Sequence, residues 1–209
     1  MNRFFSTFAS CLVSILIVSC TGETVDYSEP PVTPPEVIPP EAADLPTELP
    51  DVAPPTAASA PLSSISAETI EHFNEFSLKF YLANSVESRG NVCVSPLSVG
   101  AVLGMIANGD DGASRDGILK LLGFEESQEG LDALNTYYRT LLSNLPNIED
   151  GITCNVTNTL WCDPMKYRIR KSFMDAIADS YYAYGIGISP NGEAGKNAIN
   201  EFVGKNTNG

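Results

Sequence analysis

Residues 91–124 read NVCVSPLSVGAVLGMIANGDDGASRDGILKLLGF, and they give the clearest indication of the fold. Its first four residues predict a short strand, after which Ser95 suits the N-cap and Pro96 the first position of a helix. Every residue from Leu97 to Ala107 except Ser98 is apolar or small. A helix that is apolar all round is a buried one, so this helix is predicted to cross the middle of a sizeable core.

Further elements are predicted on both sides of this stretch. Gly100 and Gly104, four residues apart, are expected to let another element pack closely against one face of the buried helix. Caps, breakers and apolar spacing predict a helix over about 66–84, a helix capped by Ser114 that ends at Gly123, a helix over 127–145, a long strand over 151–163, a helix over about 170–183 and a last helix after Pro190.

Residues 1–19 predict a secretory signal peptide. Arg3 is their single charge, and the uncharged run from Phe4 to Ser19 is shorter than a stretch that spans a bilayer. The run ends in Ile-Val-Ser followed by Cys20, which resembles the lipobox of bacterial lipoproteins. The resemblance implies cleavage before Cys20 and a lipid attached to that cysteine. An ordinary signal peptide that happens to contain a cysteine is the alternative.

Residues 20–63 predict a lipid-anchored, acidic, Pro-rich stalk. They hold eleven prolines, eight acidic residues and no lysine or arginine. Proline fixes φ and removes donors, and the acids repel one another, so no core is expected here. Such a chain favours polyproline II and would form a spacer on the order of 100 Å long. A proline-rich ligand for a partner is the alternative.

Charge and chemistry narrow the function of residues 64–209. This part carries 11 basic and 18 acidic residues, which disfavours nucleic acid as a partner. A hydrolase needs a base beside its nucleophile, but the single histidine, His72, lies among glutamates in the first helix. Neither a phosphate-binding loop nor a dinucleotide fingerprint occurs. We therefore expect no enzyme activity, no catalytic residue and no cofactor.

Metal binding is not expected either. Asp110, Asp111 and Asp116 lack the alternation and the bidentate glutamate of a calcium loop. The cysteines of the expected domain are Cys93, Cys154 and Cys162, and their spacing is not that of metal ligands. They are expected to be buried free thiols, and a disulfide from Cys93 to either of the other two is the alternative.

The order of motifs resembles the N-terminal part of the serpin family. Residues 91–124 match its strand, Ser-Pro-x-Ser turn, buried helix and Ile-Leu-Lys-x-Leu-Gly-Phe helix. NTLWC (158–162) resembles its Asn-x-Leu-Trp strand, and INEFVGKNTNG (199–209) its Ile-Asn-x-Trp-Val segment, with Phe202 in place of the tryptophan. YGIGISP (184–190) fits a further strand less closely. The resemblance implies an α+β domain in which helices pack around a large central β-sheet, with its N-terminal part in residues 64–209.

The resemblance also assigns candidate site residues. Ser95 and Ser98 match the two serines of the family's shutter, where the strands of the central sheet separate, and Asn200 matches its asparagine. Polar groups there are implied to hydrogen-bond in either arrangement of the sheet. The alternative is that Ser95 merely caps the helix and Ser98 fills its first turn.

A protease inhibitor is the function that the resemblance implies. In serpins a serine (or cysteine) protease cuts an exposed reactive loop and forms an acyl-enzyme, and the loop then inserts into the central sheet and distorts the trapped protease. That loop lies near the family's C-terminus, so a longer gene product is expected, with a truncated protein as the alternative. The target protease, the cleaved bond and the inhibitory competence are not encoded in residues 1–209.

The expected protein is therefore a monomeric, lipid-anchored bacterial inhibitor outside the cytoplasm, held in the cell envelope and most simply in the outer membrane. Its expected partners are a target protease and the membrane that holds its lipid. Two alternatives stay open. One is a non-inhibitory serpin-fold lipoprotein with a binding or structural role, and the other is a surface lipoprotein of unrelated fold.

Overall fold

The computed structural model describes residues 41–86, 90–150, 152 and 154–206. The predicted signal peptide, Cys20 and the first half of the predicted stalk lie outside the described residues. The elements in chain order are η1 (Leu62–Ser64), α1 (Ala67–Ser85), α2 (Pro96–Ala107), α3 (Ala113–Leu122), α4 (Gln128–Asn144), η2 (Leu145–Asn147), β1 (Asn158–Trp161), α5 (Lys171–Tyr181), β2 (Ala183–Ile186) and α6 (Gly192–Asn206).

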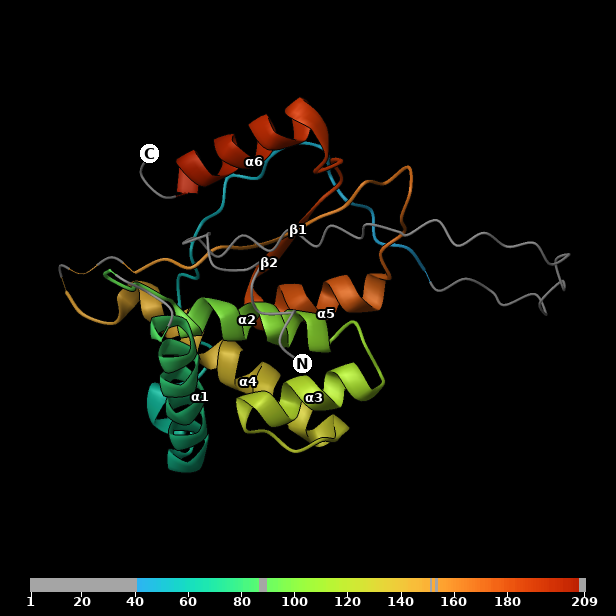
Figure 1. The fold of residues 1–209 in the computed structure, drawn as a ribbon. Coiled ribbons are helices and arrows are strands. Elements are labelled where there is room, and N and C mark those ends of the chain that lie inside the picture. The colour runs from blue at the N-terminus through green and yellow to red at the C-terminus, as the bar shows by residue number, and fades with distance from the viewer. Residues whose placement is uncertain (1–40, 87–89, 151, 153, 207–209) are drawn as a thin grey trace, which may run out of the picture.

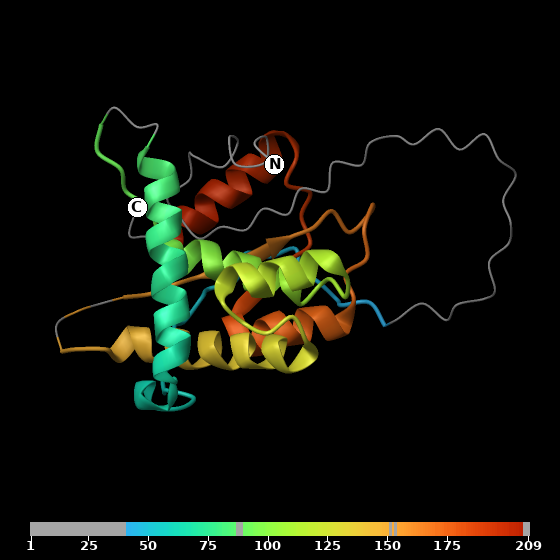
Figure 2. The same cartoon turned by 60° about the horizontal axis from the view of Figure 1, so that its bottom comes forward.

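The helices form two groups on either side of a small sheet. Helices α2, α3, α4 and α5 lie together below the strands, and α1 runs across their ends, as Figures 1 and 2 show from two directions. Helix α6 lies on the other side of the strands (Figure 1). The architecture is α+β, as predicted from the resemblance.

Strands β1 and β2 are parallel and pair from Asn158↔Ala183 to Trp161↔Ile186. The long strand predicted over 151–163 is therefore too long, because β2 offers only four residues to pair with. The strand predicted for the four residues from Asn91 is wrong for a related reason. No other strand of the described residues lies beside that segment, and a strand without a partner has no ladder of hydrogen bonds.

Most predicted helix ends are confirmed by their caps. The Ser66 side chain accepts a hydrogen bond from the Thr69 amide at 3.1 Å, and Gly123 adopts the left-handed conformation (φ 82°) at the end of α3. The predicted Ser114 cap is wrong, because Gly112 is the N-cap of α3. The Asp110 carboxylate accepts the Gly112 amide at 3.1 Å and turns the chain earlier than expected.

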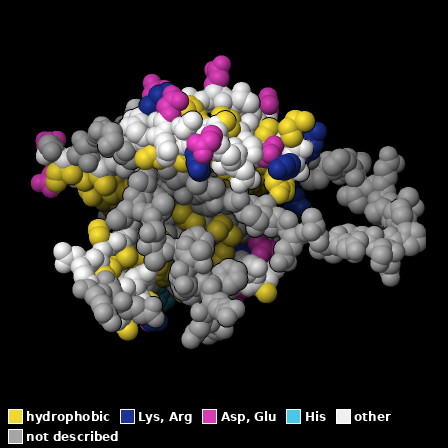
Figure 3. All heavy atoms as spheres, turned by 45° about the horizontal axis from the view of Figure 1, so that its top comes forward, with side chains coloured by type: hydrophobic (Ala, Val, Ile, Leu, Met, Phe, Trp, Pro, Cys, Tyr) yellow, Lys and Arg dark blue, Asp and Glu magenta, His cyan; other side chains and the backbone are white. Residues whose placement is uncertain are grey.

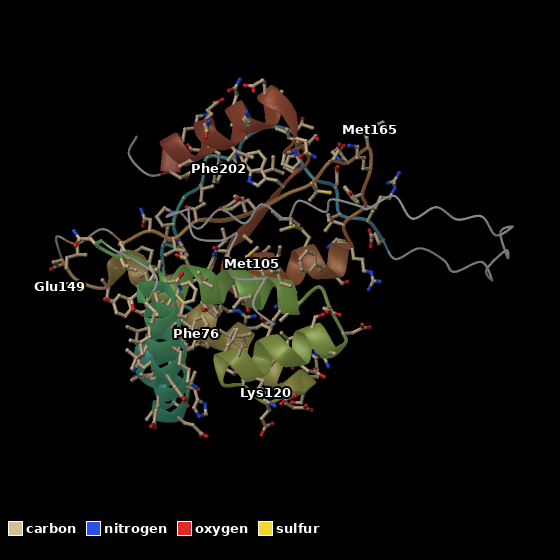
Figure 4. All side chains as sticks on the ribbon, viewed as in Figure 1. Phe76, Met105, Lys120, Glu149, Met165 and Phe202 are labelled. Carbon is tan, nitrogen blue, oxygen red and sulfur yellow. The ribbon has the colours of Figure 1, made fainter. Side chains whose placement is uncertain are left out.

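Two apolar clusters hold the fold. The larger one joins α1 to α5 around Met105 of α2, and the smaller one consists of Trp161, Ile186 and Phe202. Figure 4 shows Phe202 on the side of α6 that faces the strands and Met105 on the opposite side of the sheet. Helix α6 thus depends for its attachment on the smaller cluster.

Helix α2 is covered less completely than its sequence predicts. Gly100, Ala101, Gly104, Met105 and Ala107 are buried, whereas its other residues are half-buried or, at Ile106, 39% exposed. The described elements cover one face of the helix, so burial on all sides is not what this part of the chain produces.

The described half of the predicted stalk lies against the domain. Leu49 and Val52 pack against the smaller cluster, and the Ser59 amide donates a hydrogen bond to Ser143 Oγ at 2.9 Å. The expectation of a free spacer over 20–63 therefore differs from what is found for residues 41–63. Single apolar residues between the prolines reach a surface that the domain already supplies, so the segment needs no core of its own.

None of the helices in the described ranges combines the length and the apolar character that crossing a bilayer requires. The predicted membrane attachment through Cys20 concerns residues outside those ranges.

Candidate functional site

The N-terminal end of α2 brings together the first two predicted site residues. Ser95 Oγ lies 2.8 Å from Ser98 Oγ, and the Ser98 amide donates a hydrogen bond to Ser95 Oγ at 3.3 Å. Both serines are half-buried. This geometry is an N-cap followed by a first-turn serine, so the capping role considered in the sequence is present in the structure.

Asn200 is not part of this serine pair. It lies on α6 and is exposed, and α6 lies on the other side of the strands from α2 (Figure 1). The reason is the apolar side of α6, where Phe202 is buried and Ile199 packs beside it in the smaller cluster. That side turns toward the sheet, and Asn200 faces away from it.

Two buried tyrosines pack on the glycine face of α2. A Cβ at Gly100 would overlap Tyr138 Oη, and a Cβ at Gly104 would overlap Tyr181 Oη and lie 2.9 Å from two carbons of that ring. The two rings are 5.2 Å apart and fully buried. The close packing predicted from the glycine spacing is confirmed.

An amide pair completes this site. Tyr181 Oη donates to Asn135 Oδ1 at 2.9 Å, and the side chains of Asn108 and Asn135 exchange two hydrogen bonds of 2.8 and 2.9 Å. Asn108 Nδ2 also reaches the Gly104 carbonyl at 2.8 Å. The end of α2 is thereby tied to α4 and α5 by half-buried polar contacts at the side of the apolar core, which favour one arrangement of the three helices.

The tyrosines and asparagines were missed in the sequence. Tyr138 and Tyr181 read as ordinary apolar positions of their helices, and Asn108 reads as a turn residue after α2. Their juxtaposition depends on how three helices pack. The one signal for it was the glycine spacing, which predicts a close neighbour but does not identify it.

Burial raises the pKa of these tyrosines. Desolvation raises the pKa of Tyr137 to about 12, and desolvation together with the neighbouring tyrosines raises that of Tyr138 well above its usual range. Desolvation also raises the pKa of Tyr181, against a hydrogen bond from Asn108 that lowers it. The hydroxyls therefore stay neutral and act as hydrogen-bonding groups.

The raised pKa values predict a loss of stability in alkali. The native state keeps the three protons above about pH 10, whereas the unfolded state releases them. Stability is thus fully present below about pH 10 and falls above it, by about 1.4 kcal/mol per pH unit for each tyrosine. The urea midpoint at about pH 11 should lie well below that at about pH 9, and Tyr137→Phe should reduce the difference. Equal midpoints would contradict the burial argument.

The other candidate groups do not gather into a reactive site. Cys93 is exposed, Cys154 half-buried and Cys162 buried, and all three are free thiols. The predicted burial holds only for Cys162. No group of three or more metal-ligating side chains occurs within the described part of the chain.

Charged groups of both signs are mixed over the surface. On the face seen in Figure 3, acidic and basic side chains lie side by side. Many basic residues pair with an acid on the same helix, as Lys79 does with Glu75 and Lys205 with Glu201. A surface cavity of about 550 Å³ near the end of α2 is lined by arginines and aspartates together, among them Arg115, Arg168 and Asp111. Because both arginines and aspartates line this cavity, its described lining does not have an electrostatic potential of a single sign.

Comparison with known proteins identifies the class of this α+β domain. The family described as Serpin (serine protease inhibitor) matches residues 71–209, and the chain belongs to the serpin family. It is 32% identical over 149 residues to the plasma serine protease inhibitor of Mus musculus, covering 70% of this chain and 36% of that protein. Serpin-ZX of Arabidopsis thaliana is 31% identical over 121 residues, covering 56% of this chain and 30% of that protein.

A more distant relative is serine protease inhibitor 42Dd of Drosophila melanogaster, with 24% identity over 131 residues that cover 62% of this chain and 34% of that protein. The chain thus spans about a third of the length of the curated relatives that it matches. The matched part includes α2, both strands and α6, which are the elements of the motifs quoted from the sequence.

Proposed function

We propose that this protein inhibits serine-type proteases, with cysteine proteases as a further target class, by inserting a cleaved reactive loop into its central sheet. The observation that carries the proposal is the serpin match over residues 71–209. Relatives named serine protease inhibitors in a mammal and an insect support it. The loop itself belongs to the part of a serpin that residues 1–209 do not contain.

The end of α2 suits such a mechanism. The Ser95–Ser98 pair sits where an extended segment enters the helix, and its hydroxyls are half-buried. Hydroxyl groups rotate to suit a new partner, so these two serines can keep hydrogen bonds while strands move above them. We assign this shutter role to the two serines and to Asn200. In the described part Asn200 lies on α6, away from the serines, so the role requires that Asn200 approaches them once the central sheet is complete.

The test is a trapping assay with the natural, complete protein. Incubation with serine proteases of different specificity should give a denaturant-resistant product, because the protease serine forms an ester with a loop carbonyl as the cleaved peptide's new amino terminus leaves. A protease whose catalytic serine is replaced by alanine should give no such product. If active proteases cleave the loop and are all released intact, the non-inhibitory serpin-fold alternative replaces this proposal.

We also propose that the protein is attached to the cell envelope through a lipid on Cys20. The lipobox-like end of the predicted signal peptide supports this assignment. The protein extracted from its natural membrane should enter the detergent phase, and its N-terminal peptide should begin at Cys20 and carry the mass of acyl chains. A soluble protein with an unmodified N-terminal peptide would contradict the anchor without affecting the inhibitor proposal.

A further inference from the structure

The segment from Glu41 to Ala60 binds along the domain at four places. Near α5, the Ala43 amide donates to the Ile169 carbonyl at 2.8 Å and the Lys171 amide to the Glu41 carbonyl at 2.8 Å. At the strands, the Gly187 amide donates to the Pro46 carbonyl at 2.8 Å. The remaining two places are the smaller cluster, reached by Leu49 and Val52, and the end of α4, reached by Ser59 and Ala60.

The contact with Gly187 lies one residue past the end of β2, on the edge that faces away from β1. The Ile186 carbonyl accepts from the Cys162 amide at 3.0 Å and so points toward β1. The Gly187 N–H belongs to the same trans peptide group as the Ile186 carbonyl and points in the opposite direction, so it points away from β1. The segment therefore occupies the edge that β1 leaves unpaired.

Two glycines make room for the segment on this edge. A Cβ at Gly185 would lie 2.5 Å from Leu45 Cδ2 and 2.8 Å from Met174 Sδ, and a Cβ at Gly187 would lie 2.7 Å from the Leu45 carbonyl oxygen. A side chain at Gly187 would push the backbone of the segment away, whereas one at Gly185 would displace the flexible ends of Leu45 and Met174. The edge is thus shaped as a groove for an extended peptide with one apolar side chain, here Leu45.

We propose that residues 41–53 are a built-in strap which occupies a peptide-binding groove on the edge of β2 and thereby blocks pairing of that edge with a second molecule. The groove takes an extended, Leu-Pro-containing peptide, and its occupant is the chain's own segment. In Figure 1 this segment passes between the strands and α6. The inference concerns residues 41–206 alone and stands whether or not the protein inhibits a protease.

The composition of the strap fits this role. Pro46 and Pro50 have no amide hydrogen, so the strap carries fewer donors that could extend a ladder of strand hydrogen bonds. Asp44, Glu48 and Asp51 are exposed along it. Prolines and outward charges are devices that natural edge strands use against edge-to-edge association. Without the strap, the Gly187 amide and the apolar surface under Leu49 and Val52 would face solvent.

The first experiment compares two forms of the natural protein, one beginning at Thr21 and one at Pro54. The shorter form should associate, and a synthetic peptide of residues 41–53 should bind it and return it to a monomer in light scattering. The same peptide with Leu45→Asp should bind at least about tenfold more weakly, which is about 1.4 kcal/mol. The control peptide carries Thr47→Asp, which adds the same charge at an exposed position and should bind like the parent.

A second experiment avoids truncation. In the form beginning at Thr21, Leu45→Asp should speed hydrogen exchange of the Gly187 amide by at least about tenfold, whereas Thr47→Asp should leave it unchanged. The proposal is overturned if the shorter form stays monomeric and does not bind the peptide. It is also overturned if the Gly187 amide exchanges its hydrogen at the same rate in Leu45→Asp and Thr47→Asp.

Discussion

Gly104→Val is expected to destabilise the domain by about 3 kcal/mol or more. The new side chain would overlap Tyr181 Oη and the carbons beside it, and the Tyr181 ring is fully buried against Tyr138. Moving the ring would also break its 2.9 Å hydrogen bond to Asn135. Overpacking and a lost buried hydrogen bond therefore act together.

The matched control is Gly117→Val in α3. No atom of the described residues lies within 4 Å of a Cβ at Gly117, and valine and glycine differ little in helix propensity, so the effect of the substitution should stay within about 0.5 kcal/mol. Urea unfolding of the two variants of the natural protein measures the difference. Similar midpoints for both would show that α2 does not depend on close packing against Tyr181.

Phe202→Ala is expected to cost about 3–5 kcal/mol and to loosen α6 before the rest of the domain. Phe202 is 1% exposed and packs edge-on against Trp161, with ring centroids 5.9 Å apart. Among the described residues, the smaller cluster contains only one further buried residue, Ile186. Removing the phenyl ring thus leaves a cavity where α6 and the strap both rest.

Hydrogen exchange along α6 tests this expectation directly. The amides of α6 should lose protection in Phe202→Ala while those of α4 keep most of theirs. Phe202→Trp is the comparison variant, because the resembled family motif carries tryptophan there, and it should cost much less than the alanine. Uniform loss of protection over α4 and α6 would instead mean that the two clusters unfold as one unit.

The sequence predicted correctly those features that depend on residues close together in the chain. Ser66 and Ser95 are N-caps and Gly123 is a C-cap, as predicted. A cap forms its hydrogen bonds with residues only three or four positions away, so it can be recognised in the sequence. The glycine pair of α2 predicted a close neighbour for the same reason. The family resemblance was likewise available, since its motifs are contiguous, and the match over residues 71–209 confirms it.

The sequence failed where partners come from far along the chain. The strand predicted over 151–163 shortened to β1 because strand length depends on the partner β2. Asn200 shares a short motif with Phe202, and the burial of Phe202 against Trp161 turns Asn200 outward in the described part, so its place could not be read from the motif and its shutter role stays a prediction. Residues 41–60 were predicted to be a free stalk because acids and prolines dominate their composition. Their single apolar residues, such as Leu49 and Val52, pack against a surface that exists only in the folded domain.

The class of protein, the order of its helices and the serine pair at the start of α2 could be predicted from the amino-acid sequence, because caps, breakers and family motifs are local patterns. The packing of the helices and strands was needed to show which tyrosines fill the glycine face of α2 and where the Pro-rich segment lies against the strands. Those contacts join residues separated by tens or more than a hundred positions, and their energy comes from burial and hydrogen bonds that exist only once the helices and strands have packed.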